Sequence, residues 1–258
     1  MVKGSKVVAI TGAASGIGAA CVTRFAREGW DVVLSYFQSS EEPAAQALAQ
    51  QVRGAGQEAL LIQADVTRDE DCRRIAALTQ QRFARLDALI CSAGTTRIVP
   101  HADLDALTRD DFFNTSAVNT VGPFQIARAC APALSAGDGG AIVIVSSYGA
   151  MLGTGSSIAY AASKGATNTL TMSLARVLAP RVRVNAVCPA LVAEGFVERL
   201  NPQLFAARAA AQIQKAPLQK VGRPEDVAGD IYWLAAGTTL ITGSVVMLDC
   251  GLHLNADA

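Results

Sequence analysis

The chain has 258 residues, of which 51% are hydrophobic and 17% are charged, so it can bury a large core and does not have the composition of a disordered chain. Lysine plus arginine and aspartate plus glutamate number 22 each, and this zero formal charge argues against nucleic acid or a membrane surface as a partner; no apolar run could span a bilayer, and we expect no signal peptide in residues 1–6. Six scattered cysteines without a C-x-x-C pair, and only two histidines, predict buried thiols in a reducing compartment, which we take to be the cytoplasm, and no metal site.

The first predicted element is a β-branched strand at residues 7–10, which leads into the sequence TGAASGIG at residues 11–18. A helix is predicted next, because Ile17, Cys21 and Phe25 recur at helical spacing. A strand, a glycine-rich turn and a helix together direct backbone N–H groups and the positive end of a helix at a phosphate. The turn therefore indicates a dinucleotide site. Glycines also occur in such turns for steric reasons alone, and the spacing here is G-x-x-x-G-x-G rather than G-x-G-x-x-G.

The second predicted strand ends at Tyr36, where a dinucleotide fold meets the adenosine ribose. A carboxylate at that point would bind the ribose 2′-OH and favour NAD, but none occurs before Glu41. Ser35, Gln38 and Ser39 offer hydrogen bonds to a 2′-phosphate, although no lysine or arginine is present to neutralise it. We therefore predict that NADP(H) is favoured over NAD(H).

The third predicted strand, residues 60–62, follows a helix over about residues 42–55 and leads to Asp65 and Val66. Asp65 has two interpretations, and the sequence favours neither. It accepts a hydrogen bond from an adenine amine, or it caps the helix that begins near residues 67–69.

The fourth predicted strand, residues 86–90, ends in Ser92, Ala93 and Gly94, small residues that leave room for a ligand over the strand tip. The alternation of near-continuous apolar strands with helices predicts a parallel sheet that is covered by helices on both faces. Neither a linker nor an internal repeat divides the sequence, so we expect residues 1–258 to form one domain.

Asn119 lies among apolar neighbours in a segment, residues 110–130, that is predicted to be one helix. A buried amide needs hydrogen-bond partners. Asn119 therefore either bonds the local backbone, which is a structural role, or holds a water or a carbonyl that links Lys164 to solvent.

The clearest chemical pattern lies between residues 141 and 164. The apolar run at residues 141–145 is typical of a buried strand, and Ser147 follows it closely. Tyr160 and Lys164 are four residues apart and so share one face of a helix. A lysine ammonium close to a phenol favours the phenolate, so we predict a lowered pKa for Tyr160, which suits a group that gives and takes a proton. Taken alone, such a pair is more often a partly buried aromatic residue beside a solvated lysine.

Over essentially its whole length, the chain resembles the classical short-chain dehydrogenase/reductases. The matching motifs occur in order at compatible spacings: the turn at residues 11–18, Asp65-Val66, Ala93-Gly94, Asn119, Ser147, Tyr160-x-x-x-Lys164, Asn185 with Cys188-Pro189, and GRPEDVA at residues 222–228. The resemblance implies a single doubly wound parallel sheet of seven strands, Rossmann-like, with helices on both faces. It also implies a mobile lid at about residues 190–216 that shapes substrate choice, where the alternative is an ordinary pair of surface helices.

The resemblance also assigns roles. Tyr160 is implied to be the general acid in reduction and the general base in oxidation, Ser147 to hold the substrate oxygen, and Lys164 to lower the pKa of the phenol and bind the nicotinamide ribose. Asn119 is implied to anchor a water of the proton relay. The residues implied to contact the cofactor are Gly12, Ser15, Gly16, Ile17, Gly18, Ser35, Tyr36, Gln38, Ser39, Asp65, Val66, Ser92, Ala93, Gly94, Tyr160, Lys164, Pro189 and Val192.

Three positions depart from the family pattern. Cys91-Ser92 replaces a common pair of asparagines, and Ala190 replaces a glycine after Pro189. Glu194 stands where a threonine usually meets the nicotinamide carboxamide. A carboxylate accepts a hydrogen bond from that amide but cannot donate one, so we expect a changed contact there.

The resemblance implies an NADP(H)-dependent oxidoreductase that interconverts a ketone and a secondary alcohol. One alternative is a 3-oxoacyl-carrier-protein reductase, which the motif at residues 222–228 suits. An acidic carrier protein would need a basic docking patch, and residues 129–159 contain no lysine or arginine. A non-catalytic NADP(H)-sensing protein is a third alternative, which the retained proton relay disfavours.

The remaining expectations concern the partners. The apolar candidates for the substrate pocket predict a small uncharged carbonyl or alcohol: Ile98, Tyr148, Met151, Leu152, Val192 and Phe196. Similar chains commonly associate as homotetramers, and a homotetramer or homodimer is expected here.

Overall fold

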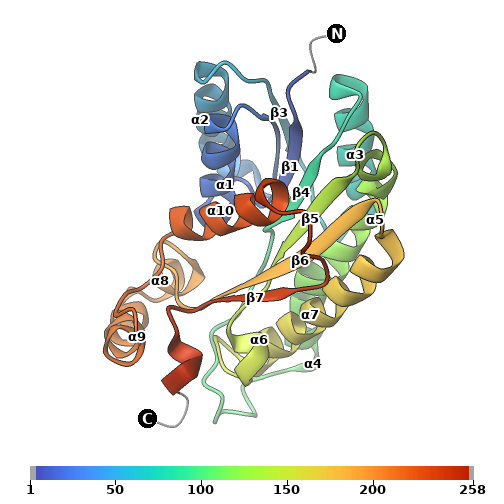
Figure 1. Ribbon diagram of the computed structural model, residues 1–258. Helices are drawn as coiled ribbons and strands as arrows, with labels where there is room; N and C mark the ends of the chain where they lie inside the picture. The colour runs from blue at the N-terminus through green and yellow to red at the C-terminus, as the bar shows by residue number, and fades with distance from the viewer. Residues whose placement is uncertain (1–3, 256–258) are drawn as a thin grey trace.

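The computed structural model describes residues 4–255, and its centre is one sheet with the strand order β3-β2-β1-β4-β5-β6-β7 (Figure 1). The strands are β1 Val7–Thr11, β2 Asp31–Tyr36, β3 Ala59–Gln63, β4 Ala88–Cys91, β5 Gly140–Val145, β6 Val182–Pro189 and β7 Val245–Leu248. Each strand runs parallel to its neighbours. The predicted doubly wound sheet of seven parallel strands is thereby confirmed. Its order reverses between β1 and β4, and ligands bind beside such a switch point.

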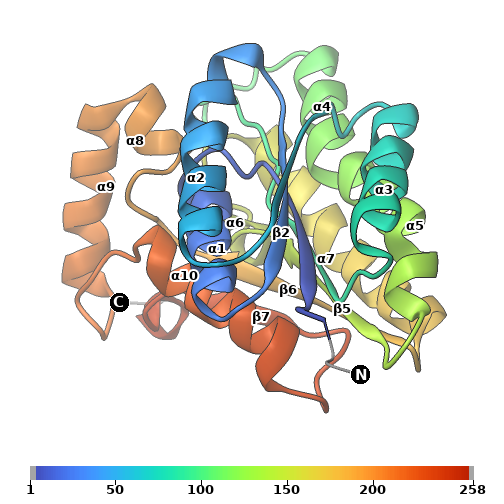
Figure 2. The same ribbon diagram turned by 90° about the horizontal axis from the view of Figure 1, so that it is seen from above.

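Helices cover both faces of the sheet, with α1, α2 and α10 on one side and α3, α5 and α7 on the other (Figure 2). The helices are α1 Gly16–Arg27, α2 Glu42–Gly54, α3 Asp69–Phe83, α4 Arg109–Ser116, α5 Gly122–Ser135, α6 Gly149–Leu152, α7 Ile158–Leu178, α8 Phe196–Leu200, α9 Pro202–Lys215 and α10 Pro224–Tyr232. Short 3₁₀ and π turns, η1 Ser39–Glu41, η2 Ala117–Val121, η3 Trp233–Gly237 and η4 Leu252–Asn255, complete the described elements. In both views α8 and α9 stand to one side of the sheet.

The central strand β1 shows how one apolar run builds both layers. Val7 and Ala9 pack into the cluster beneath α3, α5 and α7, whereas Val8 and Ile10 pack into the cluster beneath α1 and α10. Successive side chains of a strand point to opposite faces, so a strand covered on both faces must be apolar throughout. This is the physical basis of the parallel sheet that the sequence predicts.

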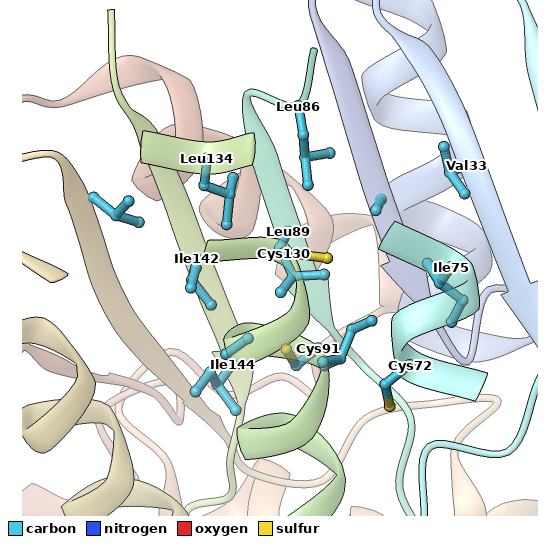
Figure 3. Packing of buried hydrophobic residues seen from close by; sticks show 14 of the residues in the cluster. Val33, Cys72, Ile75, Leu86, Leu89, Cys91, Cys130, Leu134, Ile142 and Ile144 are labelled. Atoms are coloured by element: carbon cyan, nitrogen blue, oxygen red, sulfur yellow. The ribbon is translucent and has the colours of Figure 1, made fainter. Parts of the chain in front are cut away.

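Three cysteines meet within one of these layers. Cys72, Cys91 and Cys130 pack with Leu89 and Ile75, as Figure 3 shows. Burial raises the pKa of the Cys72 and Cys130 thiols to about 12, so they behave as small hydrophobic groups. The six cysteines are all free, and five of them are buried as predicted.

The predicted single helix over residues 110–130 is wrong in one respect. The turn η2, Ala117–Val121, has π geometry and separates α4 from α5. Gly122 follows it, and a Cβ there would lie 2.8 Å from Cγ2 of Val66. Such π turns are rare and are often found at functional sites, and this one contains Asn119.

Over residues 4–255, no helix combines the length and apolarity that crossing a bilayer requires.

Candidate active site

A cavity of about 1020 Å³ lies at the carboxyl ends of the parallel strands. Its walls come from the segments that follow β1, β4, β5 and β6 and from the region of α8 and α9. Ser147, Tyr160 and Lys164 line it, and so do Gly12 and Gly16 of the glycine-rich turn. The folded chain therefore brings the predicted proton-transfer groups and the predicted phosphate site into one hollow.

The glycine-rich turn is built from close backbone contacts. Gly12 has φ +64°, and a Cβ on it would lie 2.8 Å from Cα of Ala93. A Cβ on Gly18 would lie only 2.1 Å from the carbonyl oxygen of Gly12. Ser15 precedes α1, and its hydroxyl caps no backbone N–H group of that helix. The N-terminus of α1 is therefore open toward the cavity, as phosphate binding requires.

Ser147 and Tyr160 lie together although they come from different elements. Ser147 follows β5, and Tyr160 lies in the first turn of α7, where its N–H donates to Oγ of Ser157 at 3.2 Å. The side chain of Ser147 hydrogen-bonds the phenol and lowers its pKa, but burial acts more strongly, and the pKa of Tyr160 is raised from its ordinary value. The predicted lowering of this pKa is therefore wrong for the chain by itself, and the phenol holds its proton at neutral pH.

Lys164 explains why the prediction failed. Its side chain is only 4% exposed, its Nζ donates to the carbonyl oxygen of Val145 at 2.7 Å, and it lies 5.8 Å from the centroid of the Tyr160 ring. Burial lowers the pKa of Lys164 itself to about 8. The ammonium is directed at a carbonyl oxygen, so its effect on the phenol is weaker than the spacing in the sequence suggests.

Asn119 is fully buried and does not line the cavity. Its Oδ1 accepts from the N–H of Thr95 at 2.8 Å, and its Nδ2 donates to the carbonyl oxygen of Thr95 and to Oγ of Ser163, each at 3.0 Å. Thr167 Oγ1 donates to the main-chain oxygen of Asn119 at 2.8 Å. The side chain thus ties the loop after β4 to α7, through partners distant in sequence rather than through the local backbone that the structural alternative invoked.

Most of the residues implied to contact the cofactor line the cavity: Gly12, Ser15, Gly16, Ile17, Gln38, Asp65, Val66, Ser92, Ala93, Gly94, Tyr160, Lys164, Pro189 and Val192. Four do not: Gly18, Ser35, Tyr36 and Ser39. Gly18 is packed against the backbone of the turn, and Ser35 and Tyr36 are buried in the sheet. Ser39 instead accepts a hydrogen bond from Nε2 of Gln63 at 3.2 Å.

A carboxylate lies close to the end of β2, although in the sequence the first carboxylate follows that strand by five residues. The turn η1 folds Glu41 back, so that its Oε2 accepts from the N–H groups of Phe37 and Gln38 at 2.9 and 3.1 Å. Glu41 lines the cavity beside Gln38, and no lysine or arginine lines this end within the described chain. The carboxylate that the sequence places beyond the strand end therefore lies at this end of the cavity.

Asp65 lies at the same end and is not a helix cap. Its Oδ1 accepts from the N–H and the hydroxyl of Thr67 at 2.9 and 2.8 Å, whereas α3 begins only at Asp69. The carboxylate holds the turn after β3 and lines the cavity. Of the two interpretations of Asp65, the structure excludes the one in which it caps a helix.

The substrate side of the cavity is less apolar than predicted. Tyr148, Val192 and Phe196 line it, but Ile98, Met151 and Leu152 do not. Glu194 is also absent from the lining, so its predicted contact with the nicotinamide is not supported. Sequence reasoning missed several polar lining residues: Thr96, His101, Ser156, Arg199, Arg208, Gln212 and Lys215. A signal for part of this set existed, because Arg208 and Lys215 are seven residues apart and share a face of α9.

Comparisons with known proteins agree with this geometry. A family model described as "Enoyl-(Acyl carrier protein) reductase" matches residues 12–253. The chain is 38% identical over 248 residues to a protein of Streptomyces violaceoruber provisionally named ketoacyl reductase 2 of the granaticin polyketide synthase, with 96% of each chain covered. It is 32% identical over 251 residues to a 3-oxoacyl-[acyl-carrier-protein] reductase of Synechocystis, covering 96% of this chain and 97% of that one.

A crystal structure from Burkholderia xenovorans, provisionally described as a short-chain dehydrogenase/reductase, superposes with a TM-score of 0.90 at 42% identity, covering 97% of this chain and 98% of that one. Together with the parallel sheet and the convergence of Ser147, Tyr160 and Lys164 on one cavity, these matches establish that the chain belongs to the short-chain dehydrogenase/reductase family and is an NAD(P)-dependent oxidoreductase.

Proposed function

We propose that the protein interconverts a ketone and a secondary alcohol, with Tyr160 moving the proton. The observation that carries this proposal is the shared cavity, in which the Ser147 hydroxyl, the Tyr160 phenol and the Lys164 amine face the same space as the glycine-rich turn. That space offers hydrogen-bonding groups for one substrate oxygen next to a site for a dinucleotide.

The chain fits a nicotinamide dinucleotide on steric grounds. A Cβ would collide with backbone at Gly12 and Gly18, so glycine at these positions lets the turn pack closely at the N-terminus of α1. A Cβ on Gly94 would lie 3.3 Å from Oδ1 of Asn119 and 3.8 Å from Nζ of Lys164, so a side chain there would crowd these groups. When bound, the nicotinamide ring supplies or accepts the hydride.

The chain's own residues then handle the proton. In reduction, the Ser147 hydroxyl donates a hydrogen bond to the carbonyl oxygen. The phenolic proton of Tyr160 passes to that oxygen as the carbonyl group is reduced to an alcohol. The phenolate that remains is stabilised by the positive charge of Lys164, and a solvent proton restores the phenol. Because burial raises the pKa of Tyr160, the phenol starts reduction with its proton in place.

A ketone panel tests the proposal. Purified protein is incubated with NADH or NADPH labelled with deuterium at the transferred position, and with neutral ketones, keto acids and 3-oxoacyl thioesters. We expect oxidation of the cofactor and one deuterium on the carbinol carbon of at least one product. Tight cofactor binding without label transfer to any member would contradict the proposal, and it would restore the non-catalytic sensor.

The thioesters in the panel address the second candidate, a 3-oxoacyl-carrier-protein reductase. The names of the Streptomyces and Synechocystis relatives favour it. Higher kcat/KM for 3-oxoacyl thioesters than for free ketones of equal chain length would select this candidate, and the reverse order would select a free-ketone reductase.

We further propose that NAD(H) binds at least as tightly as NADP(H), which reverses the preference that the sequence indicated. Of the three predicted donors to a 2′-phosphate, only Gln38 lines the cavity, and the Glu41 carboxylate lines it too. A phosphate next to a carboxylate without a nearby cation is repelled.

Replacing Glu41 with glutamine tests this preference. Glutamine keeps an oxygen that accepts from the Phe37 and Gln38 amides but removes the charge. We expect the Kd of NADPH to fall by about tenfold, equivalent to about 1.4 kcal/mol, with that of NADH changed by less than about threefold. Fluorescence titration measures both constants. Glu42→Gln, one residue along and outside the cavity lining, is the matched control. Wild-type protein that binds NADPH more tightly than NADH, with no change in Glu41→Gln, would contradict the preference.

The remaining proposals concern the whole molecule. We propose that residues 190–216 act as a lid within a single domain, since Cε2 of Phe196 lies 3.8 Å from the Cβ position of Gly94 and α8 thereby folds over the cavity. We also propose a homotetramer or homodimer in the cytoplasm, joined through exposed apolar side chains of α4, α5 and α7. These include Phe113, Phe124 and Val177, which are 57%, 40% and 73% exposed.

A further inference from the structure

Charge is distributed unevenly along the cavity. The carboxylates in its described lining, Glu41 and Asp65, both lie at the predicted adenosine end. The opposite end, formed largely by the proposed lid, contributes Arg199, Arg208 and Lys215. No carboxylate of the described lining lies at this end, and of its three cations Arg208 is the one whose contacts within the described chain leave most of its N–H groups open to an anion.

Arg199 is placed to serve the cofactor rather than the substrate. Its Nη1 lies 3.7 Å from the Cβ position of Gly16 and donates to the carbonyl oxygen of Glu194 at 2.9 Å. It therefore sits over the glycine-rich turn, where the pyrophosphate is expected. A positive group for the substrate must therefore come from another residue of the proposed lid.

Arg208 is close to the catalytic tyrosine. Its Nη2 donates to the carbonyl oxygen of Gly155 at 3.3 Å, a long hydrogen bond. Gly155 in turn contacts Tyr160, since its Cβ position lies 3.4 Å from Cδ1 of the ring. Gly155 thus lies between the guanidinium and the near edge of the Tyr160 ring. Within residues 4–255 Arg208 forms no ion pair, so most of its five N–H donors remain available to a ligand.

A second polar residue of the cavity lining is His101. Its Nε2 is buried without a hydrogen-bond partner in the described chain. The loop that carries His101 is fixed to the same turn as Arg208, because the N–H of Val99 donates to the carbonyl oxygen of Ser156 at 2.8 Å. Buried polar atoms without partners are rare, so this nitrogen needs a hydrogen-bond partner that the described chain does not supply.

We propose that the substrate carries an anionic group, a carboxylate or a phosphate, next to its reacting carbonyl or carbinol, and that Arg208 binds this group with His101 beside it. The proposal rests on the proposed ketone–alcohol interconversion and deepens it, replacing the uncharged substrate expected from the sequence. A guanidinium pairs with either oxyanion in a bidentate manner, so the structure defines the charge of the group, and experiment identifies which oxyanion it is.

Matched substrate pairs test the proposal. Keto acids are compared with their methyl esters and primary amides, and hydroxyketone phosphates with the free hydroxyketones. We expect kcat/KM to be at least tenfold higher for one anionic member, mainly through a lower KM. Arg208→Gln should lower kcat/KM for that member by about 10- to 100-fold and for its neutral partner by less than threefold, whereas Arg208→Lys should recover part of the loss. Arg27→Gln, at the exposed end of α1, is the control.

A binding measurement keeps the test independent of turnover. In the presence of NAD⁺, hydroxy acids or alcohol phosphates should raise the melting temperature of the wild type but not of Arg208→Gln, and their neutral analogues should raise neither. Equal turnover of charged and neutral partners, or equal losses in Arg208→Gln, would overturn the anionic substrate and leave the ketone–alcohol chemistry standing. Absence of both turnover and charge-dependent stabilisation would overturn the anionic substrate as well, whereas label transfer to no ketone at all would overturn the chemistry itself.

Discussion

Replacing Tyr160 with phenylalanine is expected to lower kcat for ketone reduction by about 10²–10⁴-fold, the usual contribution of a positioned acid or base. The substitution removes one oxygen from a side chain that lines the cavity and hydrogen-bonds Ser147. Phenylalanine keeps the ring that contacts Gly155, so we expect the Kd of NADH to stay within about threefold of the wild-type value. Steady-state kinetics and fluorescence titration measure these two effects separately.

Tyr232 provides the matched control. Its ring packs 5.2 Å from that of Phe25 in the opposite part of the molecule and does not line the cavity. Tyr232→Phe removes the same oxygen and is expected to cost some stability without a comparable loss of kcat. If Tyr160→Phe retains activity within a few-fold, or if both variants lose activity to the same degree, Tyr160 is not the proton donor.

Replacing Gly18 with alanine is expected to disrupt the glycine-rich turn. A Cβ at this position would lie 2.1 Å from the carbonyl oxygen of Gly12, which is backbone and cannot rotate away as a side chain would. Overpacking of this kind typically costs about 1–3 kcal/mol and sometimes more, which corresponds to a melting temperature lower by roughly 2–12 °C in a chain of this size. Because the displaced turn opens the predicted pyrophosphate site, we also expect NADH to bind at least about tenfold more weakly.

Gly54→Ala is the control, because it replaces a glycine without disturbing the glycine-rich turn. Gly54 is the last residue of α2, and no atom lies within 4 Å of its Cβ position. Alanine there is expected to raise the free energy of unfolding, by less than about 1 kcal/mol. Calorimetry and cofactor titration on both variants decide the matter. A Gly18→Ala protein as stable as the wild type and with unchanged affinity for NADH would show that the turn relaxes without loss.

The fold was predictable because its determinants are local and repeated. Residues 7–10 are apolar at every position, and only a strand covered on both faces explains such a run followed by a glycine-rich turn. The π turn at η2 was not predictable, because the residues of Ala117–Val121 carry no signal for π geometry and the segment is held by packing and by the contacts of Asn119.

The site was predictable where sequence spacing fixes geometry and not where the surroundings decide. The spacing of Tyr160 and Lys164 placed both on one cavity wall, but it could not show that Val145 accepts the hydrogen bond of the lysine or that burial dominates both pKa values. Glu41 was discounted because it follows Tyr36 by five residues, a distance that one 3₁₀ turn removes. Arg208 carried no prediction, because only the packing of α9 brings it into the cavity lining.

The cavity draws on both ends of the described chain, since Gly12 and Leu252 line it together. During biosynthesis the glycine-rich turn leaves the ribosome early, yet β1 cannot pair with β4 until about eighty further residues have been translated. β7 joins the sheet only after residues 245–248 have been translated, when they pair with β6. A nascent chain that lacks β7 and Leu252 therefore holds an incomplete binding site, so a tightly bound nucleotide is expected to stabilise the fold only after β7 has joined the sheet.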